Sequence, residues 1–459
     1  MSPPGRFCIV LHTHMPYVEG YGTWPFGEEW LWEAMATSYL PLLDALDAAP
    51  GRVTLSLTPV LCDQLEASGV GERFLAFLRD VRAETHRRDV AAADDPAVAR
   101  ELERSAGLYA AAAERFEARD RDLVRAFAAH AAWTSAATHA VLPLLATTTG
   151  LQLQLETGIA AHRRRFGAWR GGLWMPECAY APWLDEALEA AGVRAACVDL
   201  TDVLGPGAPA QLRPLRTGAG PLLVPIDRAI MDLVWHPAGY PSHGAYRNTR
   251  RYTGHRHTPW AVDGAPYDLA RASAQVRADA EHFVAQVARR IERGGLCVCA
   301  LDTELLGHFW HEGVAWLAAV IEACDRAGVP LARLDAALAE ESEPAPVPAG
   351  LPPTSWGDPR DLTTWSGPAA AELAWRARAA ELRVLGGAVT PPPGPRALRE
   401  LLALQASDWA FGVTRGTAGP YSRARADGHA AELERALADP GAMSRSSRNL
   451  APSLDLPNP

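Results

Sequence analysis

A dense group of acids and histidines follows one apolar run in the second half of the chain. Residues 296–301 are apolar, small or cysteine. The polar group comes directly afterwards, within eleven positions, and consists of Asp302, Glu304, His308, His311 and Glu312. Carboxylates and imidazoles in such number suit either a metal centre or an acid–base site built on carboxylates. These two possibilities predict different proteins.

Three further clusters also follow short apolar runs. The stretch "LHTHMPY" contains His12 and His14, and "GLWMPECAY" contains Trp174 and Glu177. The third, "DLVWHPAGYPSHGAYR", contains Trp235 and several tyrosines and histidines. Because α/β barrels place their active sites at the carboxyl ends of their strands, four such clusters together favour one shared site.

A metal centre is the first hypothesis for this site. His12-x-His14 with Asp302 could bind Zn²⁺, as in barrels of the amidohydrolase type. The chain contains no lysine, however, so the carboxylated lysine that bridges two metals in many such barrels is excluded. His308 and His311 are three residues apart and miss the four-residue spacing of the helical H-E-x-x-H pair.

A pair of catalytic carboxylates is the second hypothesis. Glu177 and Asp302 could act as a glycosidase pair, about 5–5.5 Å apart in an enzyme that retains anomeric configuration. Sugars present apolar faces that stack on aromatic rings, and the chain has fifteen tryptophans, many beside the clusters. This richness favours a carbohydrate as the substrate.

Composition narrows the class of protein. The net charge is −10 and no long basic run occurs among 459 residues, which argues against nucleic acid as a partner. Seven cysteines form no C-x-x-C, the apolar runs are too short to span a membrane, and the first residues do not resemble a signal peptide. We therefore expect a reduced, soluble, cytoplasmic protein without a membrane partner; the sequence leaves its oligomeric state open.

The elements that must position these clusters alternate in type. Apolar runs long enough for buried strands are separated by helical stretches such as 183–191 and 270–293, which is typical of an α/β fold with a parallel sheet. Seven strands, as in an incomplete barrel, are predicted at 7–11, 53–57, 172–175, 195–199, 222–226, 230–235 and 296–301.

Two helical regions accompany the predicted barrel. Residues 62–165 are rich in Ala, Glu and Arg with helical periodicity and predict a largely helical insertion. The barrel region then covers 1–345, and the Pro-rich stretch "EESEPAPVPAGLPP" leads into a C-terminal helical domain at 346–440. Residues 441–459 are predicted to be a disordered tail.

The motifs together resemble glycoside hydrolase family 57, and within it the 1,4-α-glucan branching enzymes. The resemblance rests on "LHTHMPY", "GLWMPECAY", "GYPSHGAYR", "ALDTELLGHFW" and "SDWAFGVTRGTAGPY", in this order, and extends to about residue 430. It implies an incomplete (β/α)7 barrel with a helical insertion and a C-terminal α-helical domain. It also implies a retaining double displacement that needs no metal and no cofactor.

The resemblance also implies roles for individual residues. Glu177 matches the nucleophile that forms a covalent glucosyl-enzyme, and Asp302 matches the general acid/base. The residues expected to bind substrate are His12, His14, His139, Trp174, Arg251, Trp260, Gly264, His308, Trp356, Trp365, Asp408 and Trp409.

The implied reaction is cleavage of an α-1,4 bond in a glucan such as amylose or a glycogen-like polymer, with transfer to a 6-hydroxyl. One departure from the pattern of the branching enzymes favours hydrolysis in place of transfer. The branching group carries a tyrosine on a mobile loop, whereas residues 201–223, taken as its equivalent, are short and contain no tyrosine. A site open to water would hydrolyse its intermediate, so amylase-like hydrolysis is the second prediction. Transfer to an unusual acceptor also stays open, and a metal hydrolase or a non-catalytic glucan-binding protein comes last.

Overall fold

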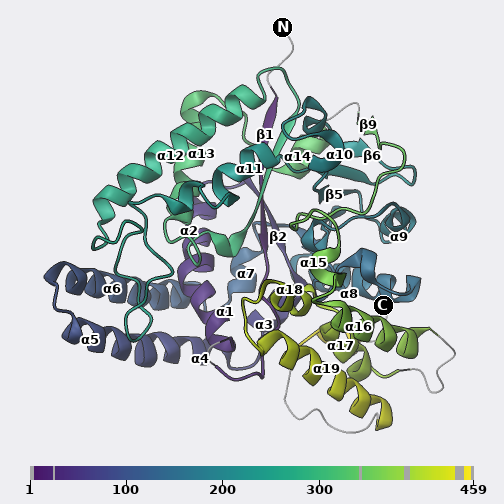
Figure 1. Cartoon of the computed structure of the whole chain (residues 1–459), viewed down its shortest axis with the longest axis horizontal. Coiled ribbons are helices and arrows are strands. Elements are labelled where there is room, and N and C mark those ends of the chain that lie inside the picture. Colours follow the sequence, from purple (N-terminus) through teal and green to yellow (C-terminus); the bar gives the residue numbers. More distant parts are fainter. Residues whose placement is uncertain (1–4, 24–25, 341–343, 387–392, 440–448, 456–459) are drawn as a thin grey trace.

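A parallel sheet forms the centre of the computed structural model, which describes residues 5–23, 26–340, 344–386, 393–439 and 449–455. Seven strands run parallel, in the spatial order β8-β1-β2-β3-β4-β5-β7 (Figure 1). They are β1 (Arg6–Thr13), β2 (Val53–Leu57), β3 (Ala131–Ser135), β4 (Gly172–Trp174), β5 (Ala195–Val198), β7 (Leu222–Pro225) and β8 (Leu296–Asp302). Nearly every residue of β1, β2 and β8 is buried, as expected for strands covered on both faces.

The barrel stays open between β7 and β8. One backbone hydrogen bond, from the amide of Asp227 to the carbonyl of Val298 at 2.8 Å, crosses the gap at the end of β7. On its outer edge β7 pairs with β6 (Leu215–Arg216), which in turn pairs with β9 (Ala345–Pro346). The predicted α/β fold with an incomplete barrel of seven parallel strands is confirmed.

The structure differs from the predicted strands in two places. Residues 230–235 were predicted as a strand but lie in helix α11 (Arg228–Trp235), whose first turn is capped by the carboxylate of Asp227. The seventh parallel strand is instead β3, inside the region predicted to be helical. A short apolar run does not distinguish strand from buried helix, and β3 is only five residues long and follows the alanine-rich stretch of the helical insertion.

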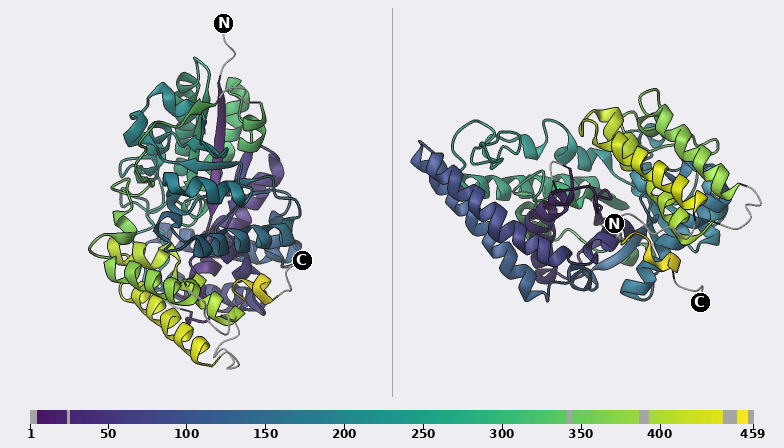
Figure 2. Two further views of the ribbon diagram at one scale, coloured as in Figure 1. Left: turned by 90° about the vertical axis from the view of Figure 1, so that its right-hand side faces the viewer. Right: turned by 90° about the horizontal axis from the view of Figure 1, so that it is seen from below.

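Helices cover the sheet and form most of the insertion. Up to β4 they are α1 (Glu28–Ala34), η1 (Met35–Tyr39), α2 (Leu40–Ala48), α3 (Pro59–Leu65), α4 (Val70–Ala76), η2 (Phe77–Arg82), α5 (Ala83–Ala92), α6 (Pro96–Ala118), α7 (Leu123–Phe127), η3 (Leu142–Leu144) and α8 (Thr148–Phe166). The α5–α6 hairpin extends beyond the barrel as two long neighbouring helices (Figure 2).

The barrel continues with smaller helical elements and two long helices. They are η4 (Pro176–Cys178), η5 (Pro182–Leu184), α9 (Asp185–Ala190), α10 (Thr201–Leu204), η6 (Pro209–Leu212), η7 (Tyr240–Ser242), α12 (Leu269–Arg290), η8 (Thr303–Leu305), α13 (Gly313–Ala327) and α14 (Leu334–Ala339). Helices α12 and α13 pack against each other beside β1 and β8 (Figure 1).

The C-terminal helices pack against the barrel where β3 and β4 end. They are α15 (Thr363–Ser366), α16 (Ala371–Leu385), α17 (Pro395–Leu404), α18 (Ser407–Arg415) and α19 (Tyr421–Ala438). Backbone bridges join Ala140 to Ala406 and Tyr180 to Thr354, so two segments of this region are fastened directly to loops of the barrel.

The tail prediction is wrong for the part of the tail that the structure describes. Residues 449–455, including the turn η9 (Pro452–Asp455), pack on the barrel, and Leu450 is buried with Tyr17 and Leu402. The amides of Asn449 and Ala451 donate to Glu19 and Asp63 at 2.8 Å each. Residues 441–448 and 456–459 of that prediction lie outside the described residues. Among the described helices, none combines the length and apolar character needed to cross a bilayer.

Candidate active site

Strand register brings His12 and Asp302 side by side. They are paired residues at the carboxyl ends of β1 and β8. Just beyond them, the hydroxyls of Thr13 and Thr303 lie 2.7 Å apart and join the two loops that leave these strands. The first and last strands of the barrel therefore deliver a buried imidazole and a carboxylate to the same point.

Glu177 and His139 both have left-handed backbone, which is uncommon outside glycine. The φ angle is 62° at Glu177, in the turn after β4, and 59° at His139, in the loop after β3. Partners from the C-terminal region hold both: Trp356 donates to the carbonyl of Glu177 at 2.9 Å, and Ser407 donates to that of His139 at 3.1 Å. Strained backbone of this kind gathers at active sites, where surrounding contacts maintain it.

Three histidines and a tryptophan form a stack beside the carboxylates. The ring centroids of His12 and Trp174 are 4.6 Å apart, those of His12 and His139 are 4.8 Å apart, and those of His14 and His139 are 4.0 Å apart. Burial, then the neighbouring charge of His14, lowers the pKa of both His12 and His139 well below the usual value. Both rings are therefore neutral near pH 7.

A chain of hydrogen bonds fixes the protons on these neutral rings. The Ser407 hydroxyl bonds to Glu177 and lies 2.8 Å from Nδ1 of His139. When it donates to the carboxylate, it accepts from His139 Nδ1–H, which leaves Nε2 of His139 as an acceptor. His12 Nε2–H then donates to that atom across 2.9 Å. The Nε2 atoms of the two rings are thus bonded to each other, while Nδ1 of His12 is buried with no hydrogen-bond partner among the described residues.

His14 differs from its two neighbours because Asp408 lies 3.1 Å from its Nε2. Burial alone would lower the pKa of His14, but the charge and hydrogen bond of Asp408 raise it above its usual value, with help from Glu304 and Glu177. His14 is therefore the member of the stack that most readily takes up a second proton. Its positive charge, when present, favours the ionised form of the surrounding acids.

The three acids are in different environments. Burial, then the charges of Glu304 and Glu177, raises the pKa of Asp302 well above its usual value. Burial also raises the pKa of Glu177, but hydrogen bonds from Trp356 and Ser407 oppose that rise. Burial raises the pKa of Glu304 to about 7, although Tyr39 donates to its carboxylate at 2.6 Å. Asp302 is the acid most inclined to hold a proton.

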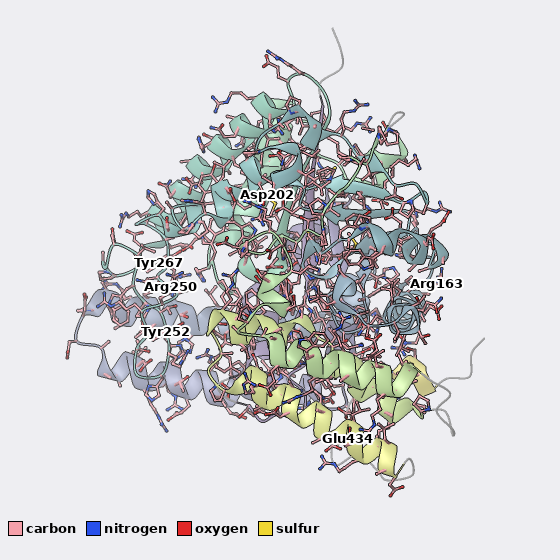
Figure 3. The ribbon with its side chains drawn as sticks, turned by 45° about the vertical axis from the view of Figure 1, so that its right-hand side comes forward. Arg163, Asp202, Arg250, Tyr252, Tyr267 and Glu434 are labelled. Atoms are coloured by element: carbon pink, nitrogen blue, oxygen red, sulfur yellow. The ribbon has the colours of Figure 1, made fainter. Side chains whose placement is uncertain are left out.

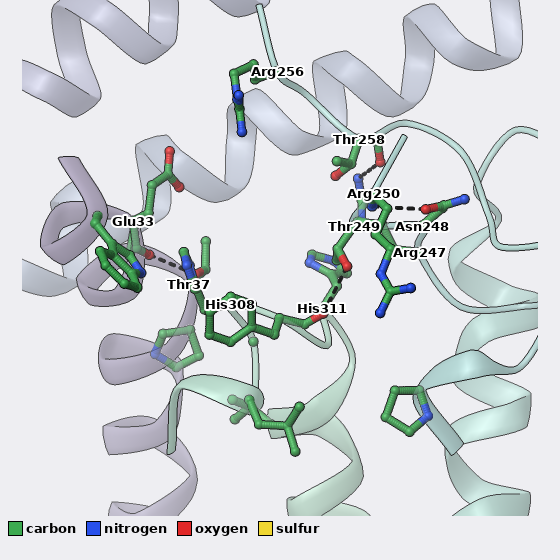
Figure 4. Close-up of a pocket in the computed structure, with 18 of the residues that line it drawn as sticks. Glu33, Thr37, Arg247, Asn248, Thr249, Arg250, Arg256, Thr258, His308 and His311 are labelled. Atoms are coloured by element: carbon green, nitrogen blue, oxygen red, sulfur yellow. Dashed lines mark hydrogen bonds between the residues drawn. The ribbon is translucent and has the colours of Figure 1, made fainter. Parts of the chain in front are cut away.

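A cleft of about 1730 Å³ opens beside this site (Figure 4). Helix α1, the insertion, the loop after α11, the turn after β8 and α18 line it. Glu177 and Asp302 do not line the cleft themselves. It meets the site at Asp408, which contacts His14, and at Trp235, whose ring centroid is 6.3 Å from that of Trp356.

The structure brings most of the residues expected to bind substrate to this region. His12, His14, His139, Trp174, Trp356 and Asp408 surround the two carboxylates, and His308 lines the cleft. Trp409 touches the cleft but is only 2% exposed, and its indole donates to the carbonyl of Ala403.

Four expected residues do not reach the site. Trp365 is 2% exposed and packs with Val141 and Ala179, so its ring offers no free face. Arg251, Trp260 and Gly264 contact one another instead. The Arg251 guanidinium lies 4.1 Å from the centre of the Trp260 ring and donates to the Gly264 carbonyl, and none of the three lines the cleft.

Two residues of the site were missed from the sequence. Ser407 directly precedes Asp408 in "SDWAF", so the motif contained a signal for it. Tyr39 belongs to a helical segment far from any cluster, and nothing in its surroundings in the sequence points to Glu304.

Comparisons with known proteins show the family to which the chain belongs. Residues 132–344 match the family model of glycosyl hydrolase family 57, and residues 395–451 match the C-terminal domain of 1,4-α-glucan branching enzymes. A probable 1,4-α-glucan branching enzyme of Mycobacterium tuberculosis is 34% identical, over 98% of this chain and 94% of that protein. A 1,4-α-glucan branching enzyme of Thermococcus kodakarensis is 30% identical, over 94% of this chain and 73% of that protein.

Solved structures lead to the same family. The GH57-type branching enzyme of Pyrococcus horikoshii superposes with a TM-score of 0.88 at 29% identity, covering 98% of this chain and 94% of that one. The α-amylase AmyC of Thermotoga maritima has a TM-score of 0.80 at 22% identity, covering 98% and 96%, which is a likeness of fold alone. With full-length relatives at this level of identity, the chain belongs to glycosyl hydrolase family 57.

Proposed function

We propose that this protein is a 1,4-α-glucan branching enzyme that works by retaining double displacement. The observation that carries the proposal is the contrast between two neighbouring carboxyl groups. Hydrogen bonds from Trp356 and Ser407 favour the ionised form of Glu177, whereas burial and two nearby acids favour the protonated form of Asp302. Acid and nucleophile roles follow from such a difference in environment.

In the first step the Glu177 carboxylate attacks the anomeric carbon of a glucan. The α-1,4 bond breaks, Asp302 donates its proton to the leaving oxygen, and a covalent glucosyl-enzyme forms. Of the three histidines, His12 has a ring nitrogen to spare: its Nδ1 is buried with no hydrogen-bond partner among the described residues, and we assign it to accept a hydrogen bond from a hydroxyl of the reacting sugar.

In the second step a 6-hydroxyl of another glucan chain attacks the same carbon. Its proton passes to Asp302, the bond to Glu177 breaks, and an α-1,6 bond forms with the original anomeric configuration. Two inversions at one carbon give retention, and Asp302 returns to its protonated state for the next cycle.

The names of the relatives support transfer over hydrolysis. Both matched relatives above are described as 1,4-α-glucan branching enzymes, and so is the C-terminal domain model. The hydrolytic alternative depended on residues 201–223 being a lid that lacks tyrosine. In the structure this stretch connects β5 to β7, and Leu212 contacts Gly295 at the opposite end of β8 from Asp302. The part of the stretch around Leu212 therefore lies away from the two carboxylates, although Asp202, at its start, pairs with Arg360 near Trp356.

We also propose that the enzyme acts in the cytoplasm, in the synthesis of a glycogen-like polymer. All seven cysteines are free thiols buried in the protein, which suits a reducing compartment.

The test uses amylose and follows two products by proton NMR, the α-1,6 anomeric protons and new reducing ends. The wild type is expected to form α-1,6 linkages in excess of reducing ends, and Glu177→Gln and Asp302→Asn to abolish both. Glu322→Gln, an exposed acid on α13, is the matched control and should behave as wild type. Reducing ends without α-1,6 signals would refute branching, and near-normal turnover by either site variant would refute the roles of the carboxylates.

A further inference from the structure

The turn after Asp302 presents an exposed phenyl ring to the cleft. Phe309 is 53% exposed and lines the cleft, while the next residue, Trp310, is buried. The backbone of the turn is tied down: Phe309 donates to the carbonyl of Glu304 at 3.1 Å, and Gly307 donates to that of Trp310 at 2.8 Å. The exposed ring thus sits on a backbone fixed to the element that carries the proposed acid.

At Gly307 the turn packs closely against the backbone of η1. The φ angle of this glycine is +97°, and a Cβ atom there would lie 2.0 Å from the carbonyl oxygen of Thr37. Only glycine fits this position. The close contact with the backbone of η1 fixes the direction in which Phe309 extends.

The loop after α11 adds a second exposed ring. Thr249 donates its hydroxyl to the carbonyl of Phe309 at 3.1 Å, so the loop joins the turn (Figure 4). Tyr252, three residues on, is 47% exposed in the same cleft, with the Arg256 guanidinium 4.7 Å from its ring centre. Figure 3 shows Tyr252 and Arg250 on this loop.

The loop that carries Tyr252 is itself anchored. His255 Nδ1 lies 2.6 Å from the Asp89 carboxylate of α5, and the Thr253 hydroxyl donates to the same carboxylate. The insertion thus holds the loop in place on one side while Thr249 holds it on the other. Exposed aromatic side chains on tethered backbone can bind a ligand without a large loss of conformational entropy.

We propose that Phe309 and Tyr252 form the platform for the acceptor glucan, the chain whose 6-hydroxyl attacks the glucosyl-enzyme. This inference rests on the proposed function. Asp302 protonates the leaving chain and later takes the proton of the acceptor, so both chains occupy its side of the reacting sugar. Phe309 follows Asp302 along the chain into the cleft, whereas Trp356 and Trp235 line the side of Glu177.

Occupancy of this platform decides the fate of the intermediate. With an acceptor bound, the bond between the anomeric carbon and Glu177 breaks, the bond to the 6-oxygen forms, and the proton goes to Asp302. With water in that place, the same bond breaks and the product is a new reducing end. The ratio of α-1,6 linkages to reducing ends therefore reports acceptor binding and is independent of how fast the intermediate forms.

The experiment measures this ratio by proton NMR with amylose for Phe309→Ala, Tyr252→Ala and the wild type. Loss of one aromatic contact is expected to lower the ratio about fivefold. Phe309→Trp, which keeps a ring at the position, should restore it. Trp375→Ala removes a tryptophan that is 69% exposed on α16, outside the cleft, and should leave the ratio unchanged.

The outcomes separate this proposal from the proposed function. A lower ratio in both alanine variants, with recovery in Phe309→Trp, supports the platform. An unchanged ratio in the alanine variants overturns it, whatever their overall rate, because only folded enzyme contributes product. Absence of α-1,6 signals from the wild type would instead refute branching itself.

Discussion

Trp356 contacts Glu177 twice. Its backbone amide donates to the Glu177 carbonyl at 2.9 Å, and its indole Nε1–H donates to the carboxylate at 3.0 Å. The first bond holds the left-handed backbone of Glu177, and the second favours the charged form of its side chain. One residue from the region after the barrel therefore governs both the position and the ionisation of the proposed nucleophile.

Trp356→Phe separates these two contributions, because the backbone bond survives and the indole bond is lost. In the wild type the indole bond lowers the pKa of Glu177. Its loss therefore raises that pKa, and the acidic limb of kcat/KM moves to higher pH. At the optimum, kcat/KM should fall about tenfold to hundredfold, the value of a hydrogen bond to a charged group. Initial rates of amylose conversion across pH provide the measurement. Trp235→Phe is the control and should leave the limb in place; a limb that does not move in Trp356→Phe contradicts the assignment.

The charge of Glu304 raises the pKa of Asp302, the proposed acid. After burial, its charge is the largest cause of the raised pKa of Asp302. In Glu304→Gln that charge is absent, so the pKa of Asp302 falls and the alkaline limb of kcat/KM, where the acid loses its proton, moves to lower pH. The effect should be largest above pH 7, because the pKa of Glu304 itself is about 7. The same pH–rate profiles measure it, and Glu304→Asp, which keeps the charge, should shift the limb less. An alkaline limb that moves to higher pH would contradict this role.

The segment at 449–455 fastens the C-terminal helices to the barrel. Leu450 is buried between Tyr17 of the barrel and Leu402 of α17, the helix that leads to Ser407 and Asp408. Leu450→Ala should lower the free energy of unfolding by about 2–4 kcal/mol, through lost burial and the cavity left behind. Urea unfolding followed by fluorescence measures this. Leu454→Ala, at a half-buried position of the same cluster, should cost clearly less, and equal losses would argue against the anchor.

Residues at the carboxyl ends of strands, or just beyond them, were predictable from the sequence. His12 and Asp302 were found because apolar runs end at them, and parallel register then places their backbones side by side. Glu177 was found in the same way, after β4. These predictions depend only on the buried strands of a parallel sheet and on the edge at which such sheets place polar residues.

Contacts between distant segments were not predictable from the sequence. Trp356 and Trp365 occur in similar surroundings, yet one bonds to Glu177 and the other is enclosed by Val141 and Ala179. The difference depends on how the helical region packs against the barrel, which no local pattern encodes. The interaction of Tyr39 with Glu304, 265 residues apart, was missed for the same reason.

The contact between His86 of α5 and His257 of the loop after α11 should make the free energy of unfolding fall in acid. Their rings stack with centroids 3.6 Å apart. Burial lowers the pKa of His86 to about 4 and, with the charge of His86, that of His257 to about 2. Both values lie below the ~6.5 of an unfolded histidine, so the unfolded chain binds protons first and stability is lost as pH falls from about 6.5 toward 4.

For His86 this loss amounts to roughly 2 kcal/mol at pH 4.5. His86→Gln has no proton to gain, so the difference between its unfolding free energies at pH 7 and pH 4.5 should be smaller than in the wild type by that amount. Urea unfolding at the two pH values measures it. His236→Gln, at an exposed position, should keep the wild-type difference. If His86→Gln keeps it as well, the buried imidazole pair is not the source of the acid sensitivity.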